Sequence, residues 1–292
     1  MSQPTKINQS VKALTQQIED LMVARDLRGM KHLQKALTPG YYQRAAEILF
    51  DCKGTILIGT GFPVDDTFET DGPVGAIALY DTLKHLGANP IIVCGDPLAR
   101  VIGDDYQVHQ ISVGNLSVGR QEAIDGLKKL NPGVVLSIER PGLSAGGFYA
   151  NMRGEDISTR CACFDYFLKE ASCPTIAIGD GGNEIGMGNV SEALSALSIT
   201  PSVTSCDELL VADVSNWGAH GIIALLAYWS KEDLLSKINT LDTLKYISAR
   251  GSVDGVTRLN TLTEDSLESD AGQQLIDELR HRYCIVMVTH SM

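Results

Sequence analysis

The sequence lacks the motifs that mark several common enzyme classes. It contains seven cysteines and six histidines, but no Cys-x-x-Cys and no His-Glu-x-x-His, which argues against the usual zinc sites. No Walker lysine follows a glycine loop. We therefore expect no activation of a substrate by ATP.

Clusters of basic residues and long apolar runs are also missing. The chain has a formal net charge of -12 and no block of Lys and Arg, so we expect no binding to nucleic acid or to anionic membranes. The longest apolar stretch, Ile222 to Trp229, is far too short to span a bilayer, and the first residues lack the apolar core of a signal peptide. A cytoplasmic protein with reduced cysteines is the expectation.

The residues that are present predict an α/β fold. Apolar residues make up 44% of the chain, which is ample for a core, and from Thr55 onward short β-branched runs alternate with helical patterns. Strands are expected at 55–58, 91–94, 109–113, 134–138, 175–178, 209–212 and 285–288, and helices at 73–86, 119–130, 157–171, 190–198 and 219–229. This alternation is typical of a doubly wound, mostly parallel sheet with helices on both faces.

The amino-terminal residues have helical spacing instead. Val11, Leu14, Ile18 and Met22 recur every three or four positions, and two further helical patterns follow before position 51. We expect a single α/β domain over residues 1–292, with residues 1–50 as a helical N-terminal extension; a domain boundary near Asp51 is the alternative.

The most informative stretch is Thr175 to Gly188. A continuously apolar run ends in glycines that hold two carboxylates and an amide, Asp180, Glu184 and Asn183. In open α/β sheets ligands bind at the carboxyl ends of the strands, and glycines let the backbone N–H groups of Gly181 and Gly182 approach a ligand. Because carboxylates repel phosphate, the loop is interpreted as a site for a cationic group, either a substrate amine or a metal ion.

The loop after the strand at 55–58 is long and acidic. It contains Gly59, Gly61, Asp71 and Gly72, and Pro73 follows. Thr70 or Asp71 is expected to cap the next helix, whose first N–H groups could then bind a carboxylate or phosphate. An ordinary cap explains Asp71 and Pro73 equally well, but not a loop of this length.

Both signs of charge follow the strand at 134–138. Arg140 and Arg153 are suited to bind a carboxylate in bidentate fashion, Glu139 can exchange a proton, and Asn151 stands nearby. Asp156 is interpreted as a helix cap.

One more polar side chain precedes the apolar helix expected at 219–229. Asn216 could bind a ligand, although capping by Ser215 or Asn216 is the preferred interpretation. Cys206 and Asp207 precede a strand and therefore fall at the opposite edge of the sheet, and His220 is expected to be a packed core residue.

In the order and spacing of these motifs the chain resembles the D-glutamate cyclase family, specifically its carboxyl-terminal domain. The motifs are 59–62, 69–73, 139–142, 151–157 and 178–188. The resemblance implies conversion of D-glutamate to 5-oxo-D-proline with loss of water. Eukaryotic members join this domain to an amino-terminal domain related to hydro-lyases, which this sequence does not contain. The partners to consider beyond a small acidic amino acid are therefore a second copy of the chain or a separate hydro-lyase-like protein.

The chemistry of that reaction suggests a role for each group. Asp180 or Glu184 would hold and deprotonate the ammonium, Arg153 and Arg140 would bind the carboxylates, and Glu139 would act as general acid. Backbone N–H groups at 181–183 and 72–73 would support the developing oxyanion. No organic cofactor is expected. A metal-dependent enzyme with a divalent ion near Asp180 is the second hypothesis, and a non-catalytic domain that binds an amino acid is the third.

Overall fold

The computed structural model describes the backbone of residues 3–290 and the side chains of residues 11–282. Its centre is a six-stranded sheet in the order β5-β4-β1-β6-β7-β8, and each neighbouring pair is parallel. The strands are β1 (Thr55–Gly59), β4 (Asn89–Cys94), β5 (Val108–Gln110), β6 (Val134–Ile138), β7 (Thr175–Gly179) and β8 (Glu208–Val211). A hairpin of β2 (Pro63–Val64) and β3 (Thr67–Phe68) lies outside this sheet. The predicted doubly wound α/β fold is confirmed.

The strand order reverses beside β1. The chain runs outward from β1 through β4 to β5, then returns to place β6 on the other side of β1 and continues to β7 and β8. The topological switch point is therefore between the adjacent strands β1 and β6. An open α/β sheet offers a ligand site at the carboxyl ends of the strands at such a point.

Alternate residues of each strand enter different cores. Ile56 and Ile58 of β1 belong to the larger apolar cluster on one face of the sheet, whereas Leu57 belongs to the cluster on the other face. The period of two is that of an extended strand, and burial on both faces explains why these runs are continuously apolar.

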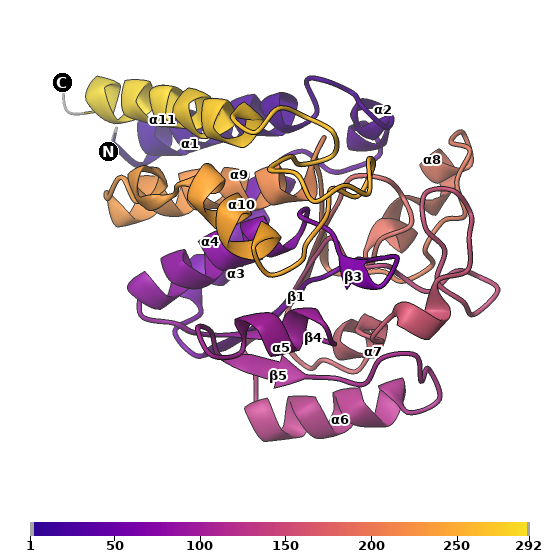
Figure 1. Cartoon of the computed structure of the whole chain (residues 1–292). Helices are drawn as coiled ribbons and strands as arrows, with labels where there is room; N and C mark the ends of the chain where they lie inside the picture. The colour runs from indigo at the N-terminus through magenta and orange to yellow at the C-terminus, as the bar shows by residue number, and fades with distance from the viewer. Residues whose placement is uncertain (1–2, 291–292) are drawn as a thin grey trace.

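Helices cover both faces (Figure 1). The larger cluster is covered by helices that contact one another around α9, and α1 and α11 lie side by side at its outer surface (Figure 1). These helices are α1 (Gln3–Met22), α3 (Tyr41–Asp51), α4 (Pro73–His85), α9 (Ser215–Ser230), α10 (Thr240–Ser248) and α11 (Ala271–His290), with the short η3 (Leu234–Lys237). The predicted helical N-terminus thus packs against the body of the domain.

Shorter elements make up the rest of the helical layers. The second face carries α2 (Met30–Gln34), α6 (Gly119–Leu130), α7 (Asp165–Lys169), η2 (Met187–Val190) and α8 (Ser191–Leu194), while η1 (Ser158–Arg160) and α5 (Leu98–Ile102) lie in connections. The cysteines at 52, 94, 161, 163, 173 and 206 are free thiols.

Several predicted elements are wrong or too long. Residues 285–288 belong to α11 and not to a strand, because a short apolar run has no periodicity that separates it from a helix segment. The helix predicted at 157–171 is interrupted at Ala162, which pairs with Val113 in a β-bridge. The helix predicted at 190–198 is limited to α8, and the strand predicted at 109–113 is β5.

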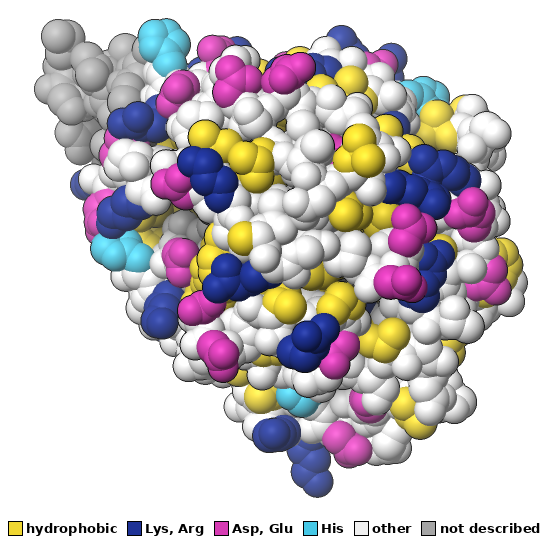
Figure 2. Space-filling view, in the orientation of Figure 1, with side chains coloured by type: hydrophobic (Ala, Val, Ile, Leu, Met, Phe, Trp, Pro, Cys, Tyr) yellow, Lys and Arg dark blue, Asp and Glu magenta, His cyan; other side chains and the backbone are white. Residues whose placement is uncertain are grey.

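No helix in the described part of the chain is long and apolar enough to cross a membrane. On the face drawn in Figure 2, acidic and basic side chains are interspersed, and the described residues form no block of one sign there.

Candidate active site

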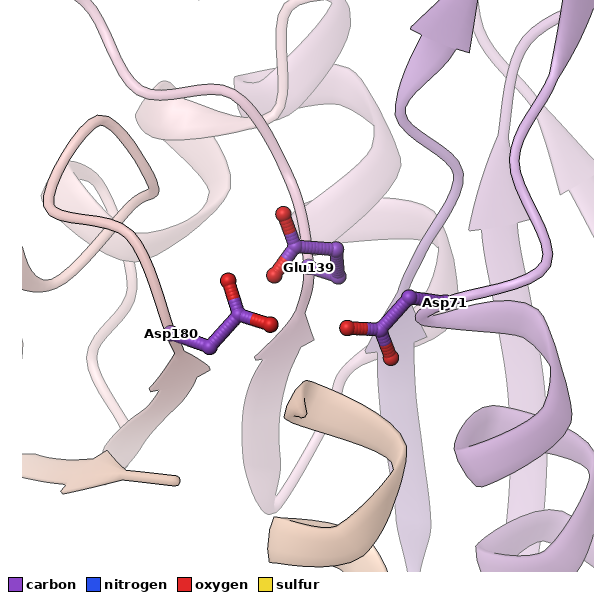
Figure 3. Close-up of side chains that lie close together, drawn as sticks. All are labelled: Asp71, Glu139 and Asp180. Carbon is purple, nitrogen blue, oxygen red and sulfur yellow. The ribbon is translucent and has the colours of Figure 1, made fainter. Parts of the chain in front are cut away.

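Three carboxyl groups meet at the switch point (Figure 3). Asp71 precedes α4 in the connection after β1, Glu139 follows β6 directly, and Asp180 follows β7. All three are buried, and one oxygen from each lies within 4.8 Å of the others. Parallel strands end at the same edge of a sheet, so side chains that are distant in sequence converge here.

The backbone is shaped to bring these groups together. Glu139 has φ of 45°, which is uncommon for a residue with a side chain and turns the chain sharply at the end of β6. Gly72 has φ of 91°, and a Cβ there would lie 2.8 Å from Thr60 Oγ1 and 2.9 Å from Glu139 Cβ. Only glycine fits this approach of the β1 and β6 loops.

Asp71 and Asn216 cap each other's helices. The Asp71 carboxylate accepts hydrogen bonds from the N–H groups of Ser215 at 2.9 Å and Asn216 at 2.7 Å, at the start of α9. Asn216 Oδ1 in turn accepts from Gly72 at 2.8 Å and Gly75 at 2.7 Å, at the start of α4. The sequence predicted that each residue caps the helix that follows it in the chain. In the structure each caps the other helix, because the starts of α4 and α9 lie side by side.

A larger acidic cluster surrounds the three carboxyls. Its buried members are Glu69, Asp71, Glu139, Asp180, Glu184, Glu264 and Asp265. Arg28 forms ion pairs with Asp180 and, at 2.5 Å, with Asp265. Arg28 also donates to the carbonyl oxygen of Asp180 at 3.1 Å. One guanidinium therefore neutralises part of a cluster that otherwise carries only acids.

Burial and mutual repulsion hold these acids toward their neutral forms. Burial raises the pKa of Glu139 well above its ordinary value, and the neighbouring Glu184 and Asp71 add to the shift. Burial raises the pKa of Asp180 more than the pairing with Arg28 lowers it. Burial also raises the pKa of Glu184, but backbone N–H groups of the 181–184 turn oppose this shift because they favour the charged form. Clusters of buried carboxyls whose pKa values are shifted in this way are typical of catalytic sites.

The acidic cluster opens into a cleft of about 560 Å³, counted to its open mouth. Glu69, Glu139, Asp180, Glu184 and Asp265 line its inner part. Three arginines with more exposed side chains line its rim, namely Arg153, Arg160 and Arg258. The inner part of the cleft therefore holds five carboxyls and the paired Arg28, and its mouth holds three arginines and the exposed Asp65.

The rim arginines differ in how firmly they are held. Arg258 pairs with Asp65 at 3.1 Å and with Glu155 at 3.3 Å. Arg160 donates to the Asp65 carbonyl at 2.9 Å. Arg153 donates to the Val256 carbonyl at 3.3 Å, forms no ion pair with a described carboxylate, as is also true of Arg160, and is the most exposed of the three. Arg153 is therefore the rim cation with the most freedom to bind a ligand carboxylate.

Arg140 lies outside the cleft that its neighbour Glu139 lines. It is buried, does not line the cleft, and donates to the carbonyl oxygens of Thr60, at 2.8 Å, and of Ala162. Its guanidinium lies over the ring of Phe164 at 5.6 Å. These contacts tie the loop after β1 to the segment before α7, so the structure places Arg140 in a supporting position.

Some of the remaining predicted site residues line the cleft and others lie outside it. Asn151, Gly181 and Asn183 line the cleft, and Gly182 donates its N–H to Glu184 at 2.7 Å. Outside the cleft lining are Asp71, Gly72, Asn216, Gly59 and Gly61. The N–H of Gly72, predicted to meet an oxyanion, is already bonded to Asp71 and Asn216.

Comparison with known families places this site in a wider context. A family model described as "D-glutamate cyclase-like, C-terminal" matches residues 18–280. The chain belongs to this family. The resemblance noted from the motifs is confirmed, and the match extends from the first helix to α11.

Named relatives add a coarser likeness. The chain is 32% identical over 199 residues to human "D-glutamate cyclase, mitochondrial", which is 59% of this chain and 32% of that protein. The chain therefore spans about a third of that relative's length. Among solved structures, an exopolyphosphatase-related protein from Bacteroides fragilis has a TM-score of 0.44 at 10% identity, covering 84% of this chain and 57% of the other. An aldohexose dehydrogenase from Thermoplasma acidophilum has a TM-score of 0.25 at 12% identity, covering 80% and 88%. Neither structural likeness is close enough to carry an argument.

Some site residues of this family member were not predicted. Arg28 comes from the segment between α1 and α2, and Asp265 and Glu264 come from the loop between α10 and α11. Glu69 was recognised only as part of an acidic loop. No local pattern marks Arg28, whereas the adjacent Glu264 and Asp265 in a long loop could have been noted as a weak signal.

Proposed function

We propose that this protein is a D-glutamate cyclase-like lyase that converts D-glutamate to 5-oxo-D-proline and water. The observation that carries the proposal is the uneven distribution of charge in the cleft: carboxyls outnumber the single Arg28 inside, and arginines outnumber the single Asp65 at the mouth. D-glutamate has one ammonium and two carboxylates, so a site for it needs both signs of charge in fixed positions. Family membership supports the same substrate class.

Two protons move from nitrogen to oxygen in this reaction. The α-amine must lose a proton before its nitrogen attacks the γ-carboxyl carbon, and a second proton leaves when the amide forms. The γ-carboxyl gives up one oxygen, which accepts two protons and departs as water. A base beside the amine and an acid beside the γ-carboxyl therefore suffice, without a redox step or ATP.

The cleft supplies candidates for each role. Glu184 is the best-placed base, because backbone N–H groups favour its charged form while burial raises its pKa toward neutrality. Glu139 and Asp180 would hold the ammonium beside it, and Arg153 would bind a carboxylate at the mouth. In this proposal Asp180 is an anchor, since Arg28 already occupies one of its oxygens.

A metal-dependent enzyme is the second candidate. The convergence of Asp71, Glu139 and Asp180 favours it, because carboxylate oxygens suit Mg²⁺ or Mn²⁺. The donor set fits only partly, since Asp71 already accepts three backbone hydrogen bonds and Asp180 is paired with Arg28. The ion would have to compete with Arg28 for Asp180, and for this reason we rank the metal-free reaction first.

The deciding experiment is proton NMR of the purified protein with D-glutamate, with and without EDTA. We expect 5-oxo-D-proline to accumulate in both samples, and no product from L-glutamate. Activity that EDTA abolishes and Mg²⁺ or Mn²⁺ restores would favour the metal-dependent enzyme. Saturable binding of D-glutamate without any product would leave the third hypothesis, a binding domain.

Location and assembly belong to the same proposal. We expect a cytoplasmic protein, which cell fractionation would test, although the human relative is named as mitochondrial. A second copy of the chain or a separate hydro-lyase-like protein would be the partner. Light scattering on the purified chain, and turnover by the chain alone, would distinguish these arrangements from a self-sufficient monomer.

A further inference from the structure

Glu69 differs from every other carboxyl of the acidic cluster. Each of the others accepts at least one hydrogen bond from a described residue: Asp71 from 72, 215 and 216, Glu139 from Ser215, Asp180 and Asp265 from Arg28, Glu184 from Gly182, and Glu264 from Asn216. Among the described residues none donates to the Glu69 carboxyl, although the residue is only 8% exposed. Its carboxyl lines the cleft, so a ligand there can reach a group that no described residue binds.

The surroundings of Glu69 keep its carboxyl at the cleft. Its backbone is fixed by a parallel β-bridge to Val253 and by its N–H bond to the Phe62 carbonyl at 3.1 Å. Gly255, two residues beyond Val253, also lines the cleft, and a Cβ at Gly255 would overlap Oε2 of Glu69. The absence of a side chain at 255 therefore leaves the space that the Glu69 carboxyl occupies.

The charges around Glu69 favour its protonated form. Burial raises its pKa well above the ordinary value, and the carboxyls of Asp265, Asp71 and Glu184 raise it further, while Arg28 lowers it. A protonated carboxyl is a hydrogen-bond donor and can give its proton to a ligand in the cleft. The Glu69 carboxyl therefore lines the ligand site and accepts no hydrogen bond from the part of the chain that the structure describes, which leaves it free to exchange a proton with a ligand.

We propose that Glu69 is the general acid of the cyclisation, an inference that rests on the proposed function. Its proton passes to the γ-carboxylate, which makes that carbon a better acceptor for the amine. The new N–C bond forms, the C–O bond breaks, and the oxygen leaves as water with the Glu69 proton and one more. Of the two protons that nitrogen releases through Glu184, one completes the water molecule and the other restores Glu69, so protons balance over the cycle. Glu139, already bonded to Ser215 and beside Asp180, is left to hold the ammonium.

The central test is Glu69→Gln, which preserves size and mimics the neutral acid. We expect kcat to fall roughly 10²-fold with little change in KM. In the wild type the rate should fall at high pH as the acid loses its proton, and the variant should not show this fall. Asp66→Asn is the matched control, because Asp66 lies in the same loop, is exposed and does not line the cleft. It should keep wild-type kinetics.

Two further measurements separate chemistry from structure. Gly255→Ala leaves the Glu69 carboxyl intact but displaces it, so kcat should fall while the circular dichroism spectrum and urea midpoint stay close to wild type. Infrared difference spectra at neutral pH should contain a protonated carboxyl band that Glu69→Gln lacks.

The outcomes keep the two proposals apart. If the wild type cyclises D-glutamate and Glu69→Gln does so equally well, the assignment of Glu69 is wrong and the function stands. A raised KM with unchanged kcat would make Glu69 a binding group instead, and would also overturn the assignment. If the wild type makes no product under any condition, the proposed function and the role of Glu69 in it fail together.

Discussion

Asp165 and Glu69 are both buried acids, yet the protein surrounds them in opposite ways. Asp165 is fully buried at the start of α7, and both of its oxygens have donors. Oδ1 accepts from the Leu143 N–H at 2.9 Å and from the Thr204 hydroxyl, and Oδ2 accepts from the Tyr149 hydroxyl at 2.5 Å. Glu69 and its neighbours at the switch point are crowded with other acids instead.

The difference separates a carboxyl that is fully engaged within the fold from one that is available to a ligand. A carboxyl whose oxygens are all satisfied contributes to stability and has no capacity left for a ligand. A carboxyl held against other acids destabilises the fold and exchanges protons readily near neutral pH. Burial alone therefore does not identify a site; the identity and number of the donors do.

The largest expected effect is the loss of activity in Asp180→Asn. The change keeps size and removes a carboxyl that can ionise and pair with the substrate ammonium, so turnover of D-glutamate should fall by roughly 10²-fold or more. Stability should change little, because Arg28 keeps its pair with Asp265. Kinetics by NMR and elemental analysis of the same samples check this. Near-normal turnover would make Asp180 a turn residue, and loss of a stoichiometric divalent ion would make it a metal ligand.

Asp165→Asn should show the opposite pattern. An amide cannot reproduce the acceptors that serve Tyr149, Thr204 and Leu143, so the free energy of unfolding should fall by about 1–3 kcal/mol. Urea denaturation measures this fall, and activity per folded molecule should stay close to wild type. A variant of normal stability with lost activity would break the distinction between the two kinds of buried acid.

The pH dependence of stability sharpens the comparison. Burial raises the pKa of Glu264 from 4.5 to about 8, while in the unfolded chain this group ionises near its ordinary value. Between those values the folded protein keeps a proton that the unfolded chain has lost, so stability falls as pH rises, by at most about 1.4 kcal/mol per pH unit for one group. Glu264→Gln should flatten this slope in urea titrations between pH 5 and 8. Equal slopes in both proteins would contradict the shift.

How much of this could be predicted from the sequence depends on the range of each contact. Glu139 and Asp180 were predicted because each follows a strand directly, and parallel strands end at one edge. Arg28 was not, since its ion-pair partners lie 152 and 237 positions away and no local pattern connects them. Glu69 was visible as an acid in a long loop, but its lack of a hydrogen-bond donor is a property of the folded neighbours. The same limit explains 285–288, where a short apolar run was assigned to a strand and belongs to a helix.

The smallest expected effect is that of Arg153→Lys at the rim of the cleft. Lysine keeps the charge but loses the planar fork that binds a carboxylate through two N–H groups, so the KM for D-glutamate should rise while kcat changes little. The loss should be about 1 kcal/mol, or roughly fivefold, because Arg153 is exposed and water and salt screen the contact. Arg120→Lys, on the exposed surface of α6 and outside the cleft, is the matched control. If both variants keep the wild-type KM at low salt, the rim does not recognise the substrate carboxylate through Arg153, and Arg160 or Arg258 would have to supply that contact.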